Sequence, residues 1–187
     1  MFIEQTFLHD LNLCDEIVDF FNNSEFAKTN KQSGSIATTR GKISTDLTIG
    51  VNMIKSFPVM MRYFDELKQS TNQYIKKYPR SNQYSGWGLI EGVNIQHYKP
   101  MEGYFQWHTE RISSNYPNCA RHLVFMTYLN DVTDKGETEF YHQNLKVSAE
   151  KGKTVIWPAD WTHTHRGVVS PSQDKYIITG WLSFMGN

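Results

Sequence analysis

Two histidines and a glutamate have residue types and a spacing that suit a metal site. His108 and Glu110 are separated by one residue, and His165 follows much later in the chain. In an extended strand, side chains two positions apart point to the same face, so His108 and Glu110 can reach one ion together. Two imidazoles and one carboxylate on one side of an iron leave positions free for a co-substrate and dioxygen, as in non-haem Fe(II) oxygenases. The pattern therefore predicts an Fe(II) centre held by these three side chains.

A lysine that follows His165 adds a positive charge to this candidate site. If the run from Lys175 to Phe184 is an extended strand, Lys175, Thr179 and Trp181 share one face of it. An ammonium fixed on that face suits the carboxylate of a bound ligand. We therefore expect a carboxylate-bearing co-substrate beside the metal, with Lys175 and the Thr179 hydroxyl facing it.

His163 is a second candidate for the last metal position. It lies two residues before His165, so the two histidines share one face of an extended strand. Strand geometry therefore leaves both open as ligands.

Length and charge limit the classes of protein that this chain can represent. Its 187 residues suffice for one well-cored domain and are too few for two of ordinary size, so we expect a single domain over 1–187. Basic and acidic residues each number 19, so no overall charge attracts nucleic acid or an anionic membrane. Both partners are therefore disfavoured.

The cysteines and the amino terminus indicate a compartment. Cys14 and Cys119 form neither a CxxC pair nor a secreted disulfide pattern. Met1–Asn12 lacks a basic segment followed by an apolar run, and no run of about eighteen apolar residues occurs. We therefore expect a soluble cytoplasmic protein with no membrane partner.

Residues 1–80 are predicted to be mostly helical support and loop. Asn12 is a candidate N-cap for a helix that ends near Asn23, and a second helix is predicted from Ser56-Phe57-Pro58 to the residue before Pro79. The apolar faces are Leu13, Ile17, Phe20 and Phe21 on the first helix, and Met60, Phe64, Leu67, Thr71 and Tyr74 on the second. Thr29–Gly50 is rich in small polar residues and is predicted to be an irregular loop.

Residues 81–187 are predicted to form the catalytic half from about eight short strands. The expected strands are Trp87–Tyr98, Tyr104–Glu110, His122–Leu129, Thr138–Tyr141, Leu145–Val147, Thr154–Trp157, Val168–Val169 and Lys175–Phe184. This order favours a mainly β fold with flanking helices, a double-stranded β-helix or jelly roll, with both helices packed against one outer face.

Ordered motifs in the catalytic half resemble a known family. They are Tyr98, Gly103-Tyr104, His108, Tyr128-Leu129-Asn130, Gly136-Glu137-Thr138-Glu139-Phe140, Gly152, Trp157-Pro158, His165-Arg166-Gly167-Val168-Val169, Lys175-Tyr176 and Trp181. In order and spacing, from Val93 to Phe184, they resemble the 2-oxoglutarate and Fe(II)-dependent dioxygenases. The nearest resemblance is to the prolyl 4-hydroxylase-like group, in its small microbial or phage-encoded members.

The resemblance assigns roles to individual residues. It implies that His108, Glu110 and His165 bind iron and that Lys175 pairs with the distal carboxylate of 2-oxoglutarate. The family places its second histidine about ten residues before the basic residue and just ahead of a Gly-x-Val step, which favours His165 over His163. His163 is then interpreted as lying beside the ligands or on the substrate side.

Two tyrosines and one departure from the family pattern complete the assignment. Tyr128 matches a position whose hydroxyl assists the lysine, and Tyr98 matches one near the other end of the co-substrate. Glu110 stands where this group usually has aspartate. Glutamate adds a methylene and rotamer freedom, so it must fold back or its strand must lie farther from the iron.

The implied reaction is oxidative decarboxylation of 2-oxoglutarate to succinate and CO2, coupled to hydroxylation of a C–H bond by O2, with ascorbate as a further cofactor. The preferred substrate is a prolyl residue in a peptide or protein, and the preferred place is the cytoplasm, that of the host if the protein is phage-encoded. Alternatives are hydroxylation of another amino acid or small molecule, oxidative demethylation of nucleic acid, and a non-enzymatic jelly-roll binding module. Control of substrate approach is expected from Thr29–Gly50 and Ile112–Ala120, and the candidate substrate residues are Trp107, Arg111, Tyr116, Trp161 and His163.

Overall fold

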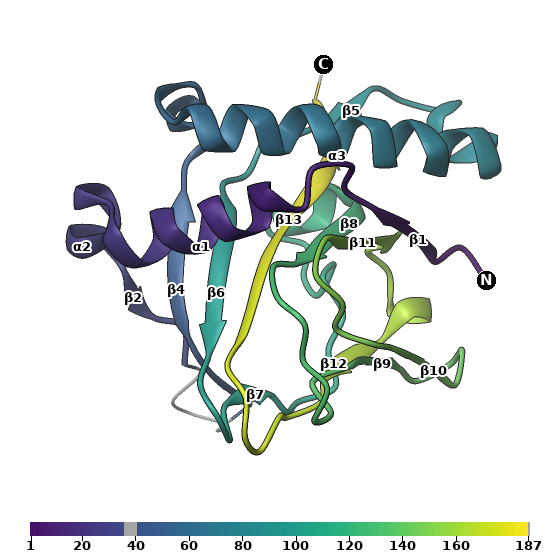
Figure 1. The fold of residues 1–187 in the computed structure, drawn as a ribbon. Helices are drawn as coiled ribbons and strands as arrows, with labels where there is room; N and C mark the ends of the chain where they lie inside the picture. Colours follow the sequence, from purple (N-terminus) through teal and green to yellow (C-terminus); the bar gives the residue numbers. More distant parts are fainter. Residues whose placement is uncertain (36–40, 187) are drawn as a thin grey trace.

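A large antiparallel sheet forms the framework of the protein. The computed structural model describes residues 1–35 and 41–186. Its major sheet has eight strands in the order β1-β11-β8-β13-β6-β4-β2, with β5 paired to β13. The strands are β1 (Glu4–Phe7), β2 (Gln32–Ser33), β4 (Thr45–Ile49), β5 (Trp87–Gly88), β6 (Val93–Tyr98), β8 (Arg121–Tyr128), β11 (Lys153–Pro158) and β13 (Lys175–Phe184). Strands distant in sequence therefore lie side by side (Figure 1).

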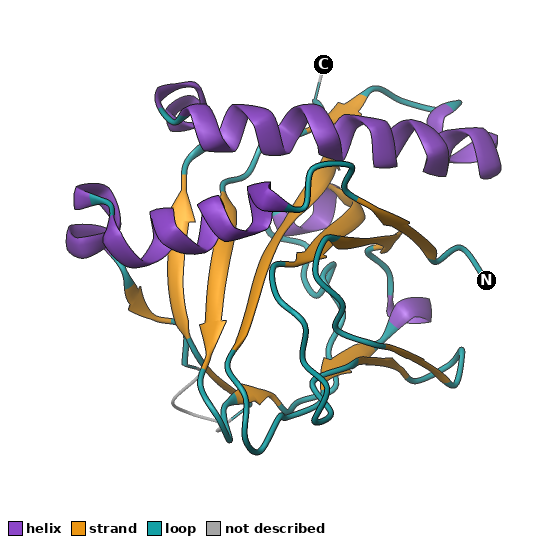
Figure 2. Ribbon diagram, in the orientation of Figure 1, coloured by secondary structure: helices purple, strands orange, loops and turns teal. Residues whose placement is uncertain are grey.

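Two smaller sheets lie across the inner face of the major sheet. One has the order β10-β9-β12 and the other pairs β3 with β7. Their strands are β3 (Lys42–Ile43), β7 (Gly103–Tyr104), β9 (Thr138–Phe140), β10 (Leu145–Val147) and β12 (His165–Gly167). The antiparallel layers form the jelly roll, and the expected mainly β fold with flanking helices is confirmed (Figure 2).

The helices cover the outer face of the major sheet. They are α1 (Asn12–Asn23), α2 (Glu25–Asn30) and α3 (Pro58–Lys77), with short 3-10 helices at η1 (Val51–Ser56), η2 (Pro79–Asn82), η3 (Asn118–Ala120) and η4 (Trp161–His163). The buried face of α1 includes Leu13, Ile17 and Phe21, as the periodicity predicts. None of the helices in the described residues is both long and apolar enough to cross a membrane.

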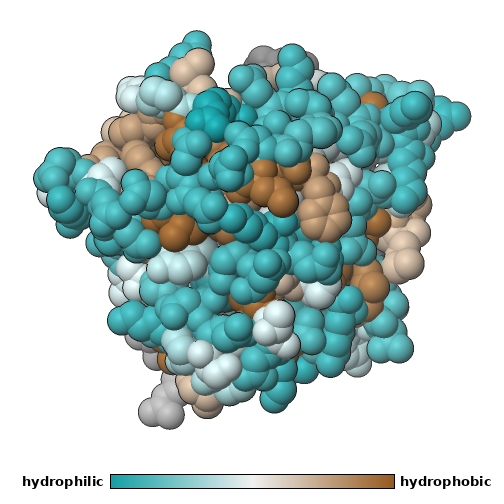
Figure 3. All heavy atoms as spheres, viewed as in Figure 1, coloured by the Kyte–Doolittle hydropathy of each residue, from teal (hydrophilic) through white to brown (hydrophobic). Residues whose placement is uncertain are grey.

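The buried apolar residues form two clusters, one beneath the helices and one inside the jelly roll. One lies between helices and sheet and includes Phe21, Met60 and Ile178. The other lies between the layers of the jelly roll and includes Phe140 and Trp157. The face seen in Figure 3 is largely hydrophilic, with apolar atoms in separate spots. Because residues of β8 and β13 belong to both clusters, apolar side chains pack against both faces of these two strands.

The prediction of an irregular loop over Thr29–Gly50 is wrong for most of the residues of this segment that the structure describes. The segment contains the end of α2 and the strands β2, β3 and β4, while residues 36–40 lie outside the described residues. Leu47 and Ile49 in β4 are fully buried, and β4 pairs with β6 along its whole length. The small polar residues of this segment favour a loop by composition. Pairing with β6 nevertheless makes β4 a strand, because strand propensity depends on such context.

Other boundaries also differ from expectation. Asn12 is the first helical residue and not the cap, and its backbone N–H donates to Asp10 Oδ1 at 3.0 Å. The expected strand over Trp87–Tyr98 divides into β5 and β6, and β12 begins at His165, so no strand forms at 168–169. The expected strand over Tyr104–Glu110 shortens to β7 and an isolated bridge at His108.

Candidate active site

A cavity of about 310 Å³ lies between the major sheet and the smaller sheets. Its lining includes His108, Glu110, His165, Lys175 and Thr179. Side chains from β13, β12 and the loop after β7 therefore meet in one enclosed space, although the chain segments that carry them are far apart.

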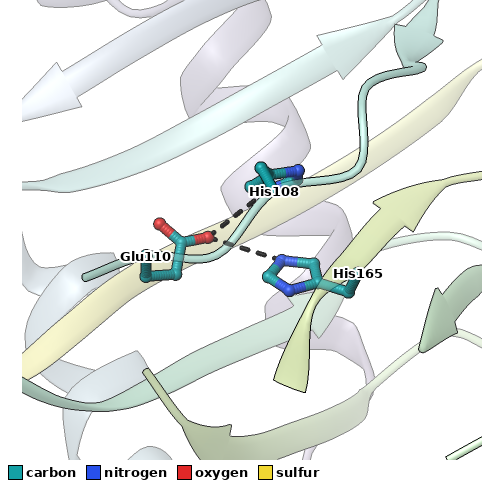
Figure 4. A group of neighbouring side chains, drawn as sticks. All are labelled: His108, Glu110 and His165. Carbon is teal, nitrogen blue, oxygen red and sulfur yellow. Dashed lines mark ion pairs between the residues drawn. The ribbon is translucent and has the colours of Figure 1, made fainter. Parts of the chain in front are cut away.

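A backbone bridge places the two histidines next to each other. The His108 N–H donates to the His165 carbonyl at 3.0 Å, and the His165 N–H donates to the His108 carbonyl at 2.9 Å. The Glu110 N–H donates to the Ala159 carbonyl at 3.3 Å, which places Glu110 over the end of β11. Figure 4 shows the three side chains pointing toward one another. The convergence comes from the bridge, and not from the strand that the sequence predicts.

Backbone carbonyls fix the orientation of both imidazoles. Nδ1 of His108 lies 2.9 Å from the Gln106 carbonyl, and Nδ1 of His165 lies 2.9 Å from the His163 carbonyl. A carbonyl only accepts, so each Nδ1 carries the proton and each Nε2 keeps its lone pair. Burial and the neighbouring His108 lower the pKa of His165. Both effects favour the neutral imidazole that a metal requires.

Glu110 presents one oxygen to the histidines and the other to a different pair of side chains. Oε1 lies 3.6 Å from His108 Nε2 and 3.4 Å from His165 Nε2. Oε2 accepts from the Trp181 indole N–H at 2.9 Å and lies 3.6 Å from an Arg121 nitrogen. The residue is therefore an oriented carboxylate.

The donor set fits one divalent transition metal. The available ligand atoms of His108, Glu110 and His165 all lie within 4.8 Å of one another. Two imidazole nitrogens and one carboxylate oxygen are the ligands of Fe(II) oxygenase centres. Trp181 and Arg121 occupy the second oxygen, so Glu110 offers the metal a single oxygen and the extra methylene of glutamate gains no rotamer freedom.

Lys175 is a buried cation with hydrogen-bonding capacity to spare. Its side chain is 7% exposed, and its Nζ donates to the Gly136 carbonyl at 2.7 Å. The ammonium lies 5.3 Å from the Tyr128 ring centroid and 5.9 Å from that of Tyr98. Within residues 1–35 and 41–186 no carboxylate forms an ion pair with it, and burial lowers the pKa of Lys175 to about 8. Two remaining N–H groups are thus available to a ligand carboxylate.

The hydroxyl groups near Lys175 have partners of their own. The Tyr98 hydroxyl donates to Gln96 Oε1 at 2.7 Å, and the Tyr128 hydroxyl donates to Thr138 Oγ1 at 2.7 Å. The Thr179 hydroxyl donates to the Phe125 carbonyl at 2.9 Å. Tyr128 therefore presents its ring to the ammonium while its hydroxyl points to β9.

The predicted substrate residues lie apart from the iron ligands. None of Trp107, Arg111, Tyr116, Trp161 and His163 is among the described residues that line the cavity. Arg111 forms an ion pair with Asp160, and Trp161 is 66% exposed on the outer surface. The imidazole of His163 is buried 3.2 Å from the Met1 carbonyl. The backbone carbonyl of His163 contacts His165 Nδ1 at 2.9 Å.

The contacts of several side chains at the site could not be predicted from the sequence. Arg121 donates to the Glu110 carbonyl at 3.0 Å and forms a 2.6 Å ion pair with Glu91, although an arginine at a strand start reads as a solvated charge. The Tyr104 ring stacks on His108 with centroids 3.6 Å apart. Trp157 packs against His165, and its buried Nε1 has no hydrogen-bond partner among the described residues. Tyr104, Trp157 and Trp181 belong to the motifs that resemble the family, and the period-two pattern of Lys175–Phe184 also points to Trp181.

Residues 93–183 match the family model of the 2OG-Fe(II) oxygenase superfamily. This range contains His108, Glu110, His165 and Lys175. Among curated proteins, no sequence gives a significant match to this chain.

Solved structures with the same fold include viral and bacterial enzymes. The viral collagen prolyl hydroxylase from Paramecium bursaria Chlorella virus-1, with 2-oxoglutarate bound, has a TM-score of 0.69 at 18% identity, over 99% of this chain and 97% of that one. A Pseudomonas putida prolyl-4-hydroxylase has a TM-score of 0.72 at 14% identity, over 99% and 94%. The Trichoplax adhaerens prolyl hydroxylase, with a hypoxia-inducible factor oxygen degradation domain peptide, has a TM-score of 0.71 at 14% identity, over 98% and 84%.

The family match, the jelly roll and the donor set agree with one another. The matched segment supplies every strand of the cavity wall that carries an iron-ligand candidate or Lys175. Residues 93–183 match the 2OG-Fe(II) oxygenase superfamily, which supports a dioxygenase, and the fold of the chain is similar to that of solved prolyl hydroxylases.

Proposed function

We propose that this dioxygenase hydroxylates prolyl residues within a polypeptide, with 2-oxoglutarate as co-substrate. The observation that carries the proposal is a single cavity with His108, Glu110 and His165 on one wall and the buried ammonium of Lys175 on another. Two of the similar structures are prolyl hydroxylases from a virus and a bacterium, and a third holds a peptide. A polypeptide substrate is therefore preferred over a free amino acid, a small molecule or a methylated nucleobase.

In this proposal His108, Glu110 and His165 hold Fe(II), and Lys175 anchors the distal carboxylate of 2-oxoglutarate. When bound, the metal and co-substrate would supply the oxidising chemistry, in which O2, 2-oxoglutarate and a C–H bond of the substrate are converted to succinate, CO2 and the hydroxylated substrate. The residues of this chain bind and orient the reactants. Lys175 keeps its bond to the Gly136 carbonyl and donates its remaining N–H groups to the carboxylate.

The tyrosines and Thr179 shape the space around the co-substrate. The rings of Tyr98 and Tyr128 exclude water from the Lys175 ammonium, which strengthens its attraction to a carboxylate. Tyr98 and Thr179 line the cavity, so we assign both to co-substrate positioning. The described cysteines, Cys14 and Cys119, are both free, which suits the cytoplasmic location that we propose.

The substrate class is tested by mass spectrometry. Proline-containing peptides are incubated with enzyme, Fe(II), 2-oxoglutarate and ascorbate, and we expect one added oxygen on a proline ring. The same mixture without ascorbate shows whether this reductant sustains turnover. Succinate formation stimulated by free amino acids or methylated nucleobases, and by no proline peptide, would reject the substrate while leaving the dioxygenase assignment in place.

The ligand set is tested by comparing two histidines two residues apart. His165→Ala is expected to abolish iron binding and succinate formation, because it removes a nitrogen of the donor set. His163→Ala is expected to keep both, because the His163 carbonyl that orients His165 remains. Iron retained in the first variant and lost in the second would reverse the assignment.

A further inference from the structure

A buried polar cluster lines the cavity beyond the iron ligands. It consists of Lys42, Ser44, Asp46 and Gln96, which we call the polar wall, and three of its members line the cavity directly. Lys42 is 7% exposed, and Asp46 and Gln96 are each 8% exposed. None of these residues takes part in holding the metal or the distal carboxylate. Charged side chains are rarely buried, because their desolvation costs free energy, so a buried charged pair in a cavity wall is a candidate binding group.

Asp46 is fully engaged within the polar wall. It accepts from Lys42 Nζ at 2.6 Å, from the Ser44 hydroxyl at 2.7 Å and from Gln96 Nε2 at 3.2 Å. Gly34 closes over this carboxylate, since a Cβ at that glycine would overlap Asp46 and Ser44. The negative charge of the wall is therefore satisfied by the protein itself.

Lys42 is not fully engaged. An ammonium has three N–H donors, and within residues 1–35 and 41–186 the only hydrogen bond of Lys42 Nζ goes to Asp46. Its remaining donors belong to a group that lines the cavity. The lysine thus resembles Lys175 in having spare donors, but differs in having a carboxylate partner that neutralises it.

The polar wall lies one tyrosine ring from an iron-ligand candidate. Lys42 is directly opposite Tyr104 in the β3–β7 pairing, and its Nζ lies 5.8 Å from the Tyr104 ring centroid. The same ring stacks on His108 with centroids 3.6 Å apart. An extended chain covers roughly 7 Å in two residues, so a peptide that places one residue at the metal can place a neighbouring carbonyl at Lys42.

We propose that Lys42, held by Asp46, binds a backbone carbonyl oxygen of the polypeptide substrate next to the residue that is hydroxylated. Because the Lys42–Asp46 pair has no net charge, it favours a neutral acceptor, while a carboxylate brought to Lys42 would lie close to Asp46. This inference rests on the proposed function and adds to it a reason for preferring a peptide over a free amino acid.

The test uses a double variant that leaves no unpaired charge. Lys42→Met alone would bury Asp46 without its partner and risk unfolding, whereas Lys42→Met with Asp46→Asn removes both charges. The matched control is Lys153→Met with Glu150→Gln. This pair also joins a buried lysine to a carboxylate, at 2.5 Å, but Glu150 is more exposed than Asp46 and neither Lys153 nor Glu150 lines the cavity.

The substrates are an N-acetylated, C-amidated proline peptide and free L-proline. For the peptide we expect the KM of the Lys42/Asp46 variant to rise about tenfold, the size of losing one hydrogen bond to a charged donor, with a smaller change in kcat. The affinity of Mn(II)-loaded protein for 2-oxoglutarate is expected to stay near that of the wild type. The control pair is expected to leave the peptide KM unchanged.

Three results would overturn the inference while leaving the proposed function in place. A wild-type KM in the Lys42/Asp46 variant would remove Lys42 from substrate binding, and an equal loss of 2-oxoglutarate affinity would show a structural role through Gln96 and Tyr98. A larger effect on free L-proline than on the blocked peptide would show carboxylate recognition. A wild-type enzyme that oxidises no proline peptide would instead overturn the proposed function, and this inference with it.

Discussion

At the scale of single residues, the orientation of Glu110 depends on Trp181. The indole N–H holds Oε2 at 2.9 Å and leaves Oε1 facing the histidines. Trp181→Phe is expected to weaken iron binding by about tenfold, as the loss of a partner that orients a metal ligand commonly does. Iron affinity, followed by titration under anaerobic conditions, is the measurement.

Trp87→Phe is the matched control for this change. It also removes an indole hydrogen bond, to the Ser81 carbonyl at 3.0 Å, but away from the cavity. Equal effects of the two substitutions on iron affinity would show that Trp181 acts only through packing.

The protonation of Lys175 sets the pH dependence of co-substrate binding. Burial lowers the pKa of this lysine to about 8, so its charge is present below that pH and is lost as the pH rises through it. Because a carboxylate requires the ammonium, the dissociation constant of 2-oxoglutarate is expected to rise about tenfold per pH unit above 8. Isothermal titration of the Mn(II)-loaded protein from pH 7 to 9.5 measures this.

Lys175→Arg and Lys175→Met separate the charge from the rest of the site. Arginine stays protonated over this range, so its variant is expected to bind 2-oxoglutarate independently of pH. The methionine variant is expected to lose at least about a hundredfold in affinity, since it leaves a carboxylate in a buried site without its cation. A pH slope that persists in the arginine variant would assign the titration to another group.

At the scale of elements, the turn before β9 positions the carbonyl that holds Lys175. Gly136 has a φ of +82°, and a Cβ there would press on the Val132 side chain. Gly136→Ala is therefore expected to destabilise the protein by about 1–3 kcal/mol and to weaken 2-oxoglutarate binding through the displaced carbonyl. Thermal unfolding and co-substrate titration measure the two effects.

Gly152→Ala provides the comparison for that turn. Gly152 has a φ of +79°, and a Cβ there would meet Leu11 outside the cavity. We expect a similar loss of stability with normal 2-oxoglutarate affinity. Weakened co-substrate binding in both variants would mean that the effect comes from general destabilisation.

At the scale of the whole molecule, the site ties together segments that are distant along the chain. Its metal-binding candidates lie on the loop after β7 and on β12, and Lys175 lies on β13. Ligands that bind only the folded protein stabilise it by about 2.7 kcal/mol at a hundred times the dissociation constant. For a chain of 187 residues this corresponds to a rise in Tm of roughly 5–10 °C.

The rise is expected in two separable steps. Mn(II) alone should raise Tm in the wild type and in Lys175→Met, because the metal-binding candidates are unchanged. Addition of 2-oxoglutarate should raise Tm further in the wild type only. A further rise of equal size in the lysine variant would show that Lys175 does not contribute to the co-substrate site, and differential scanning calorimetry decides between the outcomes.

Much of the framework was predictable because local periodicity reports which face of an element is buried. The apolar residues of α1 indicated its packing face, and those of α3 did so in part, since Tyr63 and Ser70 are buried there while Phe64 and Thr71 are only partly buried. The alternation in β13 put Lys175, Thr179 and Trp181 on one side. The types and order of His108, Glu110 and His165 indicated their chemistry. These predictions use either the spacing of neighbouring residues or the chemistry of a residue type, so they can be made without knowledge of the fold.

The remainder was decided by tertiary structure, because it depends on pairings between distant segments. The His108–His165 bridge, the contact of Trp181 with Glu110 and the Lys42–Asp46 wall beside Tyr104 all require the sheets to be assembled. The alternation of Leu47, Thr48 and Ile49 is too short to mark β4 as a strand by itself, and its pairing with β6 fixes the extended conformation. The chemical groups of the site and the buried faces of the regular elements could be predicted from the order of the amino acids. Assembly of the layers decided which of those groups share a cavity, because side chains distant in sequence come within hydrogen-bonding distance only when long-range strand pairing closes the chain around them.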